Sequence, residues 1–233
     1  MLISFVPGRI IRAEKRGIFS GHIGPTELPL DDFQIRTGGW EDEERLGALL
    51  SVSFTDDPLA RWLMPNALDF LRDSKRHPRR AYSAAFDAET VFVIGDFAGA
   101  ALWLPPGKKV DRSEEIEQAG ADVPEERAAF PKDFPELISK CEAYRPSERH
   151  WYLGLIAVDP AYRGRGVGTK LMEHCLTIVD DEAMPAYLES TSSANLSLYN
   201  RFGFQMLAEV RVGLSPPRFP MIRQAQSQPD NGG

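Results

Sequence analysis

One segment, YLGLIAVDPAYRGRGVGTK between Tyr152 and Lys170, constrains the fold more than any other part of the sequence. It opens with a continuous apolar run, which is typical of a strand buried on both faces at the centre of a sheet. A glycine-rich turn follows, and apolar residues then recur at every fourth position, at Val167, Leu171 and Cys175. That spacing predicts an amphipathic helix. We therefore expect an α/β (α+β) fold in which a central strand leads directly into a helix.

The turn between this strand and this helix has the composition of an anion-binding site. Gly164, Gly166 and Gly168 lack a Cβ atom, so an anion can approach the backbone closely. The first N–H groups of the following helix have no acceptor within the helix. Arg163 and Arg165 add forked donors suited to phosphate oxygens. The alternative is a simple glycine bend with two arginines on the surface.

Two common nucleotide-binding patterns do not match this turn. A P-loop requires a second glycine at the sixth position, but counting from Gly164 that position is Thr169. A dinucleotide fingerprint requires G-x-G-x-x-G, whereas the chain reads G-x-G-x-G. A nucleotide-binding protein is therefore the less favoured interpretation.

Patterns elsewhere predict further elements around this segment. Apolar runs predict strands at residues 33–36, 90–96, 99–105, 150–158, 185–191, 204–212 and 219–223. Helical spacing predicts helices near 41–54, 67–86, 113–143, 166–180 and 194–203. Pro78 is expected to interrupt the second helix, and the strands on either side of Asp96 are expected to form a hairpin.

Composition narrows the class of protein. The chain has 34 Asp and Glu against 27 Lys and Arg residues, which argues against a nucleic-acid partner because phosphate backbones attract basic surfaces. Its two cysteines form no C-x-x-C pair and its four histidines show no ligand spacing, so no metal is expected. No apolar run approaches the roughly 20 residues that span a bilayer. The N-terminus also lacks the order of charges of a secretory signal. We expect a cytoplasmic protein without a membrane partner.

Two motifs together resemble one known family. The pattern R-x-x-G-x-G, filled by Arg163, Gly166 and Gly168 after AVDP, resembles the pyrophosphate loop of the GNAT superfamily of acetyl-CoA-dependent N-acyltransferases. The segment YLESTSSANLSLYNRFGF resembles the next motif of that family: a strand, an Asn, a Tyr four residues later and a closing Gly-Phe. With ALWLPPG ahead of a helical insertion, the chain looks most similar to the puromycin N-acetyltransferase-like branch.

The resemblance extends over residues 33–213 and implies a GNAT fold. Such a fold has a central mixed, mostly antiparallel sheet of about six to seven strands. The sheet is splayed at the acetyl-CoA site and carries helices on both faces. We expect a single domain over residues 33–225 with a helical insertion near 105–147. An N-terminal extension of unclear structure (1–32) and a disordered tail (226–233) would flank it.

For activity, the resemblance implies an acyltransferase. It would transfer the acetyl group of its cosubstrate acetyl-CoA to a primary amine on a small molecule, by direct attack in a ternary complex. Tyr199 matches the general acid that protonates the departing sulfur, although it could instead be a half-buried structural aromatic. The resemblance also implies a set of residues that contact acetyl-CoA: Ile156, Ala157, Val158, Arg163, Gly164, Arg165, Gly166, Val167, Gly168, Thr169 and Asn195.

Three carboxylates are candidates for the base or for the acceptor site. Glu189 points to the opposite face of its strand from Leu188, so it either faces the cleft as a catalytic base or is an ordinary strand carboxylate. Asp56 and Asp57 either attract a cationic amine or cap the helix that begins at Pro58.

Aromatic side chains are the candidates for an apolar acceptor pocket. Phe54, Trp62 and Trp103 either line that pocket or pack in the core. Of these, we predict that Phe54 and Trp103 bind the substrate together with Asp57.

Two other functions remain open at this level. The chain could be a non-catalytic acyl-CoA-binding sensor, or it could acetylate a protein amine. The presence of Tyr199 favours an enzyme, because a pure binding protein needs no acid at the sulfur. The expected partner is a small-molecule amine. The protein itself is expected to be a monomer or a homodimer.

Overall fold

The computed structural model describes residues 33–73, 77–110 and 131–226. The expectations for residues 1–32 and for the tail beyond residue 226 lie outside this range, as does much of the expected insertion.

Within the described residues, seven strands form one sheet in the order β1-β2-β3-β4-β5-β7-β6. Their bounds are Ile35–Thr37 (β1), Val91–Ile94 (β2), Gly99–Leu104 (β3), Trp151–Val158 (β4), Ala186–Ser190 (β5), Gln205–Met206 (β6) and Phe219–Arg223 (β7). Neighbouring strands are antiparallel except β4 and β5, which are parallel. The expected mixed, mostly antiparallel sheet is confirmed, and so is the β2–β3 hairpin.

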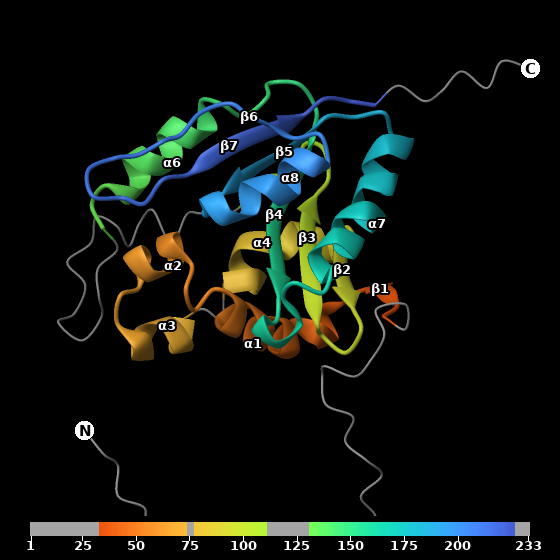
Figure 1. The fold of residues 1–233 in the computed structure, drawn as a ribbon, viewed down its shortest axis with the longest axis horizontal. Helices are drawn as coiled ribbons and strands as arrows, with labels where there is room; N and C mark the ends of the chain where they lie inside the picture. Colours follow the sequence, from red (N-terminus) through yellow and green to blue (C-terminus); the bar gives the residue numbers. More distant parts are fainter. Residues whose placement is uncertain (1–32, 74–76, 111–130, 227–233) are drawn as a thin grey trace, which may run out of the picture.

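Helices cover both faces of this sheet, as expected (Figure 1). On one face lie α7 (Val167–Asp181) and α8 (Leu196–Arg201); on the other lie α1 (Glu43–Ser53) and α4 (His77–Asp87). The remaining helices are α2 (Pro58–Leu63), α3 (Ala67–Asp73) and α6 (Phe134–Glu142), with short 3-10 turns η2 (Trp40–Asp42), η3 (Pro160–Tyr162) and η4 (Ser193–Asn195).

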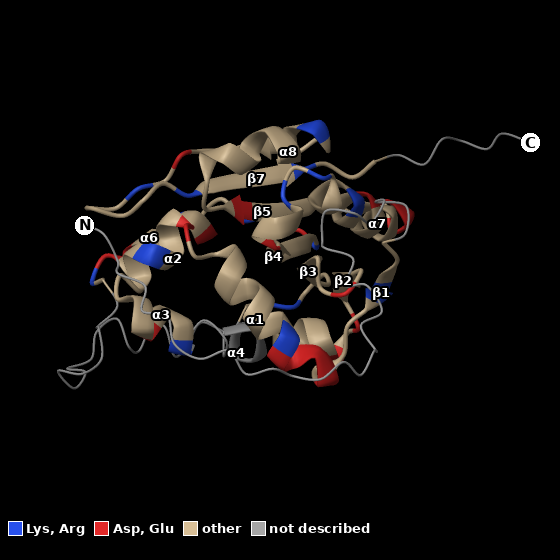
Figure 2. Cartoon of the chain, turned by 60° about the horizontal axis from the view of Figure 1, so that its bottom comes forward, with Lys and Arg blue, Asp and Glu red and all other residues tan. Residues whose placement is uncertain are grey.

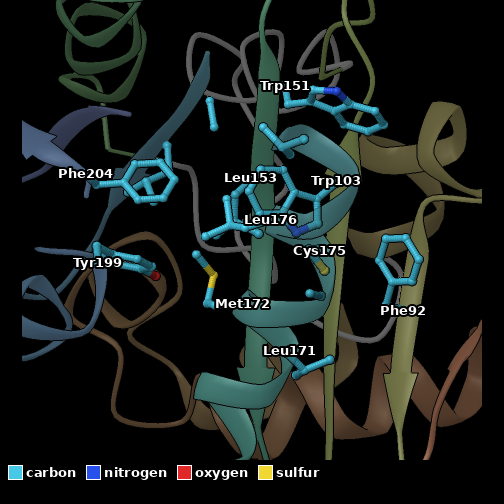
Figure 3. Packing of buried hydrophobic residues seen from close by; sticks show 14 of the residues in the cluster. Phe92, Trp103, Trp151, Leu153, Leu171, Met172, Cys175, Leu176, Tyr199 and Phe204 are labelled. Atoms are coloured by element: carbon cyan, nitrogen blue, oxygen red, sulfur yellow. The ribbon is translucent and has the colours of Figure 1, made fainter. Parts of the chain in front are cut away.

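Each face of the sheet has its own hydrophobic core. Trp103 and Leu171 belong to the core under α7 and α8 (Figure 3). Leu50, Tyr82 and Leu102 belong to the core under α1 and α4. Because side chains alternate along a strand, adjacent residues of β3 serve opposite cores. The central strands are therefore buried on both faces, which explains their continuous apolar sequence.

A third, smaller hydrophobic cluster is separate from these two cores. It joins α2, α6 and the chain between β6 and β7 through Leu59, Leu137 and Val210. Val210 also bridges Arg218 across this connection. The strand expected over residues 204–212 is present but much shorter, at Gln205–Met206. Beyond it the pairing is reduced to isolated contacts, including the bridge between Val210 and Arg218.

The start of α1 combines a favourable dipole interaction with an ion pair. Acidic residues gather there, as Figure 2 shows in red, and negative charge is stabilising at a helix N-terminus. Asp42 also accepts two hydrogen bonds from Arg36 of β1, at 2.6 and 2.8 Å. The pair fastens the first strand to the first helix.

The helical region 67–86 is divided differently from the expectation. It forms two helices, α3 and α4, and Pro78 is the second residue of α4. The N–H groups of the first helical turn have no acceptor within the helix, so a proline, which lacks an N–H, costs no hydrogen bond at that position. Pro78 therefore lies in the first turn of a helix and does not interrupt one.

Candidate active site

The sheet opens between its two central strands. β4 pairs with β5 only at Trp151, Tyr152 and Leu153, although β4 continues to Val158. Along the same stretch β4 stays paired with β3. Residues 154–156 are accordingly half-buried, although they lie in a central strand. The expected splay between the strands is confirmed by this register.

Backbone groups of β4 face this opening. Asp159 donates to the carbonyl of Ala98 at 3.0 Å, and hydrogen bonds alternate in direction along an antiparallel pair. The backbone N–H and C=O groups of Val158 therefore point away from β3. Its carbonyl accepts a hydrogen bond from the Ser53 hydroxyl at 3.1 Å. By the same alternation the N–H groups of Ile156 and Val158 face the opening, whereas that of Ala157 faces β3. Of the three β4 residues expected to contact acetyl-CoA, Ile156 and Val158 present an N–H group to the opening and Ala157 does not.

A glycine is required where β4 begins to diverge. The pairing of β3 with β4 shifts register between Leu102 and Trp103, which leaves Gly154 opposite no partner. A Cβ atom at Gly154 would lie 2.1 Å from Cε1 of Tyr82. The Tyr82 hydroxyl donates to the Gly154 carbonyl at 3.1 Å. The bulge and this close approach place a tyrosine from α4 at the edge of the opening.

The glycine turn lies at the far end of β4. Gly164 and Gly166 have φ angles of 74° and 83°, a region that favours glycine. Gly166 is the N-cap of α7 and supplies no side-chain cap, so the N–H groups of the first turn have no acceptor within the helix. A Cβ atom at Gly168 would make only ordinary contacts, 3.7 Å to Val158 and 3.8 Å to Leu198. The first turn of α7 therefore lies between the end of β4 and α8.

The two arginines of the turn make contacts within the protein. Arg163 donates to the carbonyl of Ser53 at 2.7 Å and to Asp56 at 3.2 Å, and this hydrogen bond lowers the pKa of Asp56. The guanidinium of Arg165 lies 5.5 Å from the ring centre of Tyr162. Arg163 thus joins the glycine turn to the end of α1, and its predicted contact with an anion stays a prediction.

Tyr199 is buried beside the opening. Its side chain packs in the α7 core, edge-on to Phe204, and its hydroxyl points from α8 in the direction of β4 in Figure 3. Burial raises the pKa of Tyr199, and the charge of Asp57 raises it further. The hydroxyl is therefore neutral at pH 7 and can donate a proton. Asn195, one helical turn earlier, is exposed at the start of α8.

Asp57 connects two distant segments near Tyr199. One carboxylate oxygen caps α2 by accepting from the Ala60 N–H at 2.9 Å. The other accepts from the hydroxyl of Thr191, the residue directly after β5. Asp57 is half-buried, whereas its neighbour Asp56 is exposed. Both first interpretations of this residue, helix cap and member of the site, are compatible with its position.

The structure corrects the expectations for Glu189 and Trp103. The Glu189 side chain is 2% exposed and forms an ion pair with the buried Arg218, so its carboxylate is not open to an amine. Trp103 is 1% exposed and packs in the α7 core. Phe54 is half-buried on the opposite face of the sheet, so Phe54 and Trp103 do not line one pocket.

Sequence reasoning missed three residues at this site. Ser53, Tyr82 and Thr191 make the hydrogen bonds described above. Each bonds to a segment at least 72 positions away, so no local spacing could have found them. Trp62 packs against the third cluster.

Two further searches apply to the described residues alone. They contain no group of three or more His, Cys, Asp or Glu side chains placed to hold a metal ion. None of their helices combines the length and the apolar character that crossing a membrane requires.

Comparison with known proteins shows what this architecture is similar to. A protein named as an uncharacterized N-acetyltransferase of Schizosaccharomyces pombe is 29% identical over 203 residues, which cover 81% of this chain and 82% of that protein. A structure of histone acetyltransferase HPA2 and related acetyltransferase from Corynebacterium glutamicum aligns with a TM-score of 0.59 at 22% identity, over 85% of this chain and 98% of the other. The structure of arylalkylamine N-acetyltransferase 2 from Aedes aegypti aligns with a TM-score of 0.60 at 14% identity, over 83% of this chain and 99% of the other.

The two structural matches show a shared fold. The family match is more specific, because residues 54–204 match the acetyltransferase (GNAT) family. This range contains the splayed strands, the glycine turn and Tyr199. The chain belongs to the GNAT acetyltransferase family.

Proposed function

We propose that this acetyltransferase transfers the acetyl group of acetyl-CoA to a primary amine on a small molecule, by direct attack while both substrates are bound. The observation that carries the proposal is the opening between β4 and β5. It has the first turn of α7 at one end and Tyr199 beside it. The arylalkylamine N-acetyltransferase of Aedes aegypti has the same fold, which supports an amine as acceptor.

The cosubstrate end of the site would use backbone groups. The N–H groups of Val167, Gly168 and Thr169 begin α7, and the helix dipole adds positive partial charge there. They suit the pyrophosphate of acetyl-CoA. The N–H groups of Ile156 and Val158 suit the pantetheine arm and the thioester oxygen, where donors stabilise developing negative charge.

The reacting end would use side chains. The amine must be neutral to attack, since an alkylammonium with a pKa of about 10 has no lone pair. Tyr199 would protonate the sulfur as the carbon–sulfur bond breaks. We assign Phe54 and Asp57 to the acceptor side, where they would contact the amine. Because the Glu189 carboxylate is held in a buried ion pair, we do not assign it the role of base.

Finer assignments extend this proposal. Membership of the puromycin N-acetyltransferase-like branch, a cytoplasmic location and a monomeric or homodimeric state stay predictions.

A protein acceptor is the second candidate, supported by the fold shared with a structure named for a histone acetyltransferase. An acyl-CoA sensor without catalysis is less favoured, because the buried hydroxyl of Tyr199 beside the opening has no use in a sensor.

The test is release of free thiol. The purified protein is mixed with acetyl-CoA and a panel of arylalkylamines, polyamines, aminonucleosides of the puromycin type and a lysine-containing peptide. We expect thiol release with at least one small amine, and a rise in melting temperature with acetyl-CoA. Stabilisation by acetyl-CoA without thiol release from any amine would favour the sensor. Release only with the peptide would favour a protein acceptor.

A further inference from the structure

The carboxylate of Asp57 is held by more contacts than its helix requires. An N-cap uses one side-chain oxygen, and Asp57 supplies it to the Ala60 N–H. The second oxygen is bonded to the hydroxyl of Thr191, which is 134 positions away in the sequence. This second bond adds nothing to the cap. It fixes the rotation of the carboxylate relative to the end of β5.

That position is close to the reacting end of the proposed site. Thr191 follows β5 at the end where β5 has separated from β4. The chain then runs through η4 into α8, which carries Tyr199. The charge of Asp57 acts on the Tyr199 hydroxyl. The carboxylate therefore lies within electrostatic reach of the group assigned to protonate the sulfur.

The other two candidate carboxylates do not have these properties. Asp56 is exposed and bonded to Arg163 of the glycine turn. Glu189 is buried in its pair with Arg218. Among these three, Asp57 alone combines partial exposure with proximity to Tyr199. The titratable and charged groups near it are the neutral Tyr199 hydroxyl on α8 and the neighbouring Asp56, which is paired with Arg163 of the glycine turn.

We propose that Asp57 accepts the proton that the acceptor amine loses during acetyl transfer, and that Thr191 is the positioning residue that orients the Asp57 carboxylate. The inference rests on the proposed function and deepens it by naming the base. It also names the substrate class: aliphatic amines that arrive as cations, because a carboxylate at the acceptor site attracts an ammonium group.

The protons balance without a further reactant. The amine nitrogen forms a bond to the thioester carbon, and the carbon–sulfur bond breaks. The nitrogen gives a proton to Asp57, and the sulfur takes the proton of Tyr199. The proton on Asp57 then returns to the Tyr199 oxygen, which restores both side chains. An amine that arrives as a cation first releases its additional proton to solvent.

The test uses steady-state kinetics with an amine identified by thiol release. Asparagine caps helices as well as aspartate does, so Asp57→Asn keeps α2 capped. It should lower turnover by about a hundredfold or more, within the range for general-base catalysis. The KM for acetyl-CoA should stay within about twofold of wild type.

Thr191 is tested by a pair of substitutions. Thr191→Val should lower turnover by about tenfold or more, because small misplacements of catalytic groups are costly. Thr191→Ser, which keeps the hydroxyl, should retain most of the activity. Thr177→Val is the matched control, since the hydroxyl of Thr177 on α7 bonds only locally to the Glu173 carbonyl at 3.0 Å. Melting temperatures of all variants verify that each is folded.

The outcomes separate the two levels of the proposal. If the wild type acetylates an amine, but Asp57→Asn keeps its turnover, Asp57 is not the base. If Thr191→Val behaves like Thr177→Val, or Thr191→Ser fails as Thr191→Val does, the positioning role is overturned. If the wild type acetylates no small amine, the proposed function itself fails and this inference with it.

Discussion

Tyr199 combines core packing with the chemical role that we propose for it. Its ring is part of the α7 core, while its hydroxyl faces the opening in the sheet. Burial keeps the hydroxyl protonated at neutral pH, since burial disfavours the phenolate. In this neutral form the hydroxyl can donate a hydrogen bond or its proton to the sulfur as the carbon–sulfur bond breaks.

Tyr199→Phe keeps the ring and removes only this proton. We expect turnover to fall by about tenfold to a hundredfold or more, because the thiolate must then leave unprotonated. The affinity for acetyl-CoA, measured by calorimetry, should stay within about twofold of wild type. Equal turnover in the two proteins would remove Tyr199 from the mechanism.

At the scale of elements, the first turn of α7 contains a glycine that the packing does not require. Gly168 lies in the helix with room for a Cβ atom, so packing does not require glycine there. A close approach to the backbone does require it, because a methyl group would cover the N–H groups. Helix α7 therefore has a residue of low helix propensity, Gly168, at a position where a ligand is expected.

Gly168→Ala should reveal this conflict directly. Without ligand the variant should be up to about 1 kcal/mol more stable, because alanine is the better helix former. Its affinity for acetyl-CoA should fall at least tenfold. Thermal unfolding and calorimetry measure the two effects. Gly164→Ala is the contrasting variant, since its φ of 74° should cost about 1 kcal/mol of stability. Unchanged binding by Gly168→Ala would contradict the assignment of this turn.

The junction of β1 with α1 depends on one carboxylate. The hydrogen bonds from Arg36 hold the pKa of Asp42 below its ordinary value. A lowered pKa means that the folded state favours the ionised form, so this stabilisation is present above the ordinary pKa and is lost as the pH falls through the folded pKa.

Asp42→Asn should therefore lower the free energy of unfolding by about 1–2 kcal/mol at pH 7. The difference from wild type should shrink as the pH falls below about 4. Urea denaturation at pH 7 and pH 3 measures both values. A difference that is the same at the two pH values would show that the ion pair is not its source. Asp96→Asn is the control, because the side chain of Asp96 is 88% exposed and exposed pairs contribute little.

At the scale of the whole molecule, the separation of β4 from β5 divides the sheet into two parts. One part holds β1 to β4, and the other holds β5, β7 and β6. One contact reaches β5 from the loop after α1, and another lies within the second part. Asp57 bonds to Thr191 at the end of β5, and the buried pair of Glu189 and Arg218 joins β5 to the chain that enters β7.

Glu189→Gln tests whether this ion pair is structural. It should lower the free energy of unfolding by about 3 kcal/mol or more, because it removes a carboxylate from a buried guanidinium. Glu209→Gln is the control, since its pair with Arg211 is exposed and should contribute less than about 1 kcal/mol. Urea denaturation compares the two. Unchanged stability with lost turnover would restore Glu189 as the base.

Much of the architecture could be predicted because its signals are local. The run from Tyr152 to Val158, the glycines of the turn and the helical spacing after Val167 each lie within one short segment. Strand, turn and helix propensities act over such distances. The family resemblance rested on the same residues, and the match over residues 54–204 confirms it.

The positions of side chains relative to one another were decided only by the tertiary structure. Glu189 and Trp103 are residue types that suit an active site, yet both are buried. Glu189 is paired with Arg218, an arginine 29 positions away, and Trp103 packs under α7. Thr191 has no sequence signal, but the fold brings it to Asp57. The sequence alone determined the elements and the glycine turn, because their causes are local. Only the packing of distant elements determined which carboxylate remains open beside Tyr199.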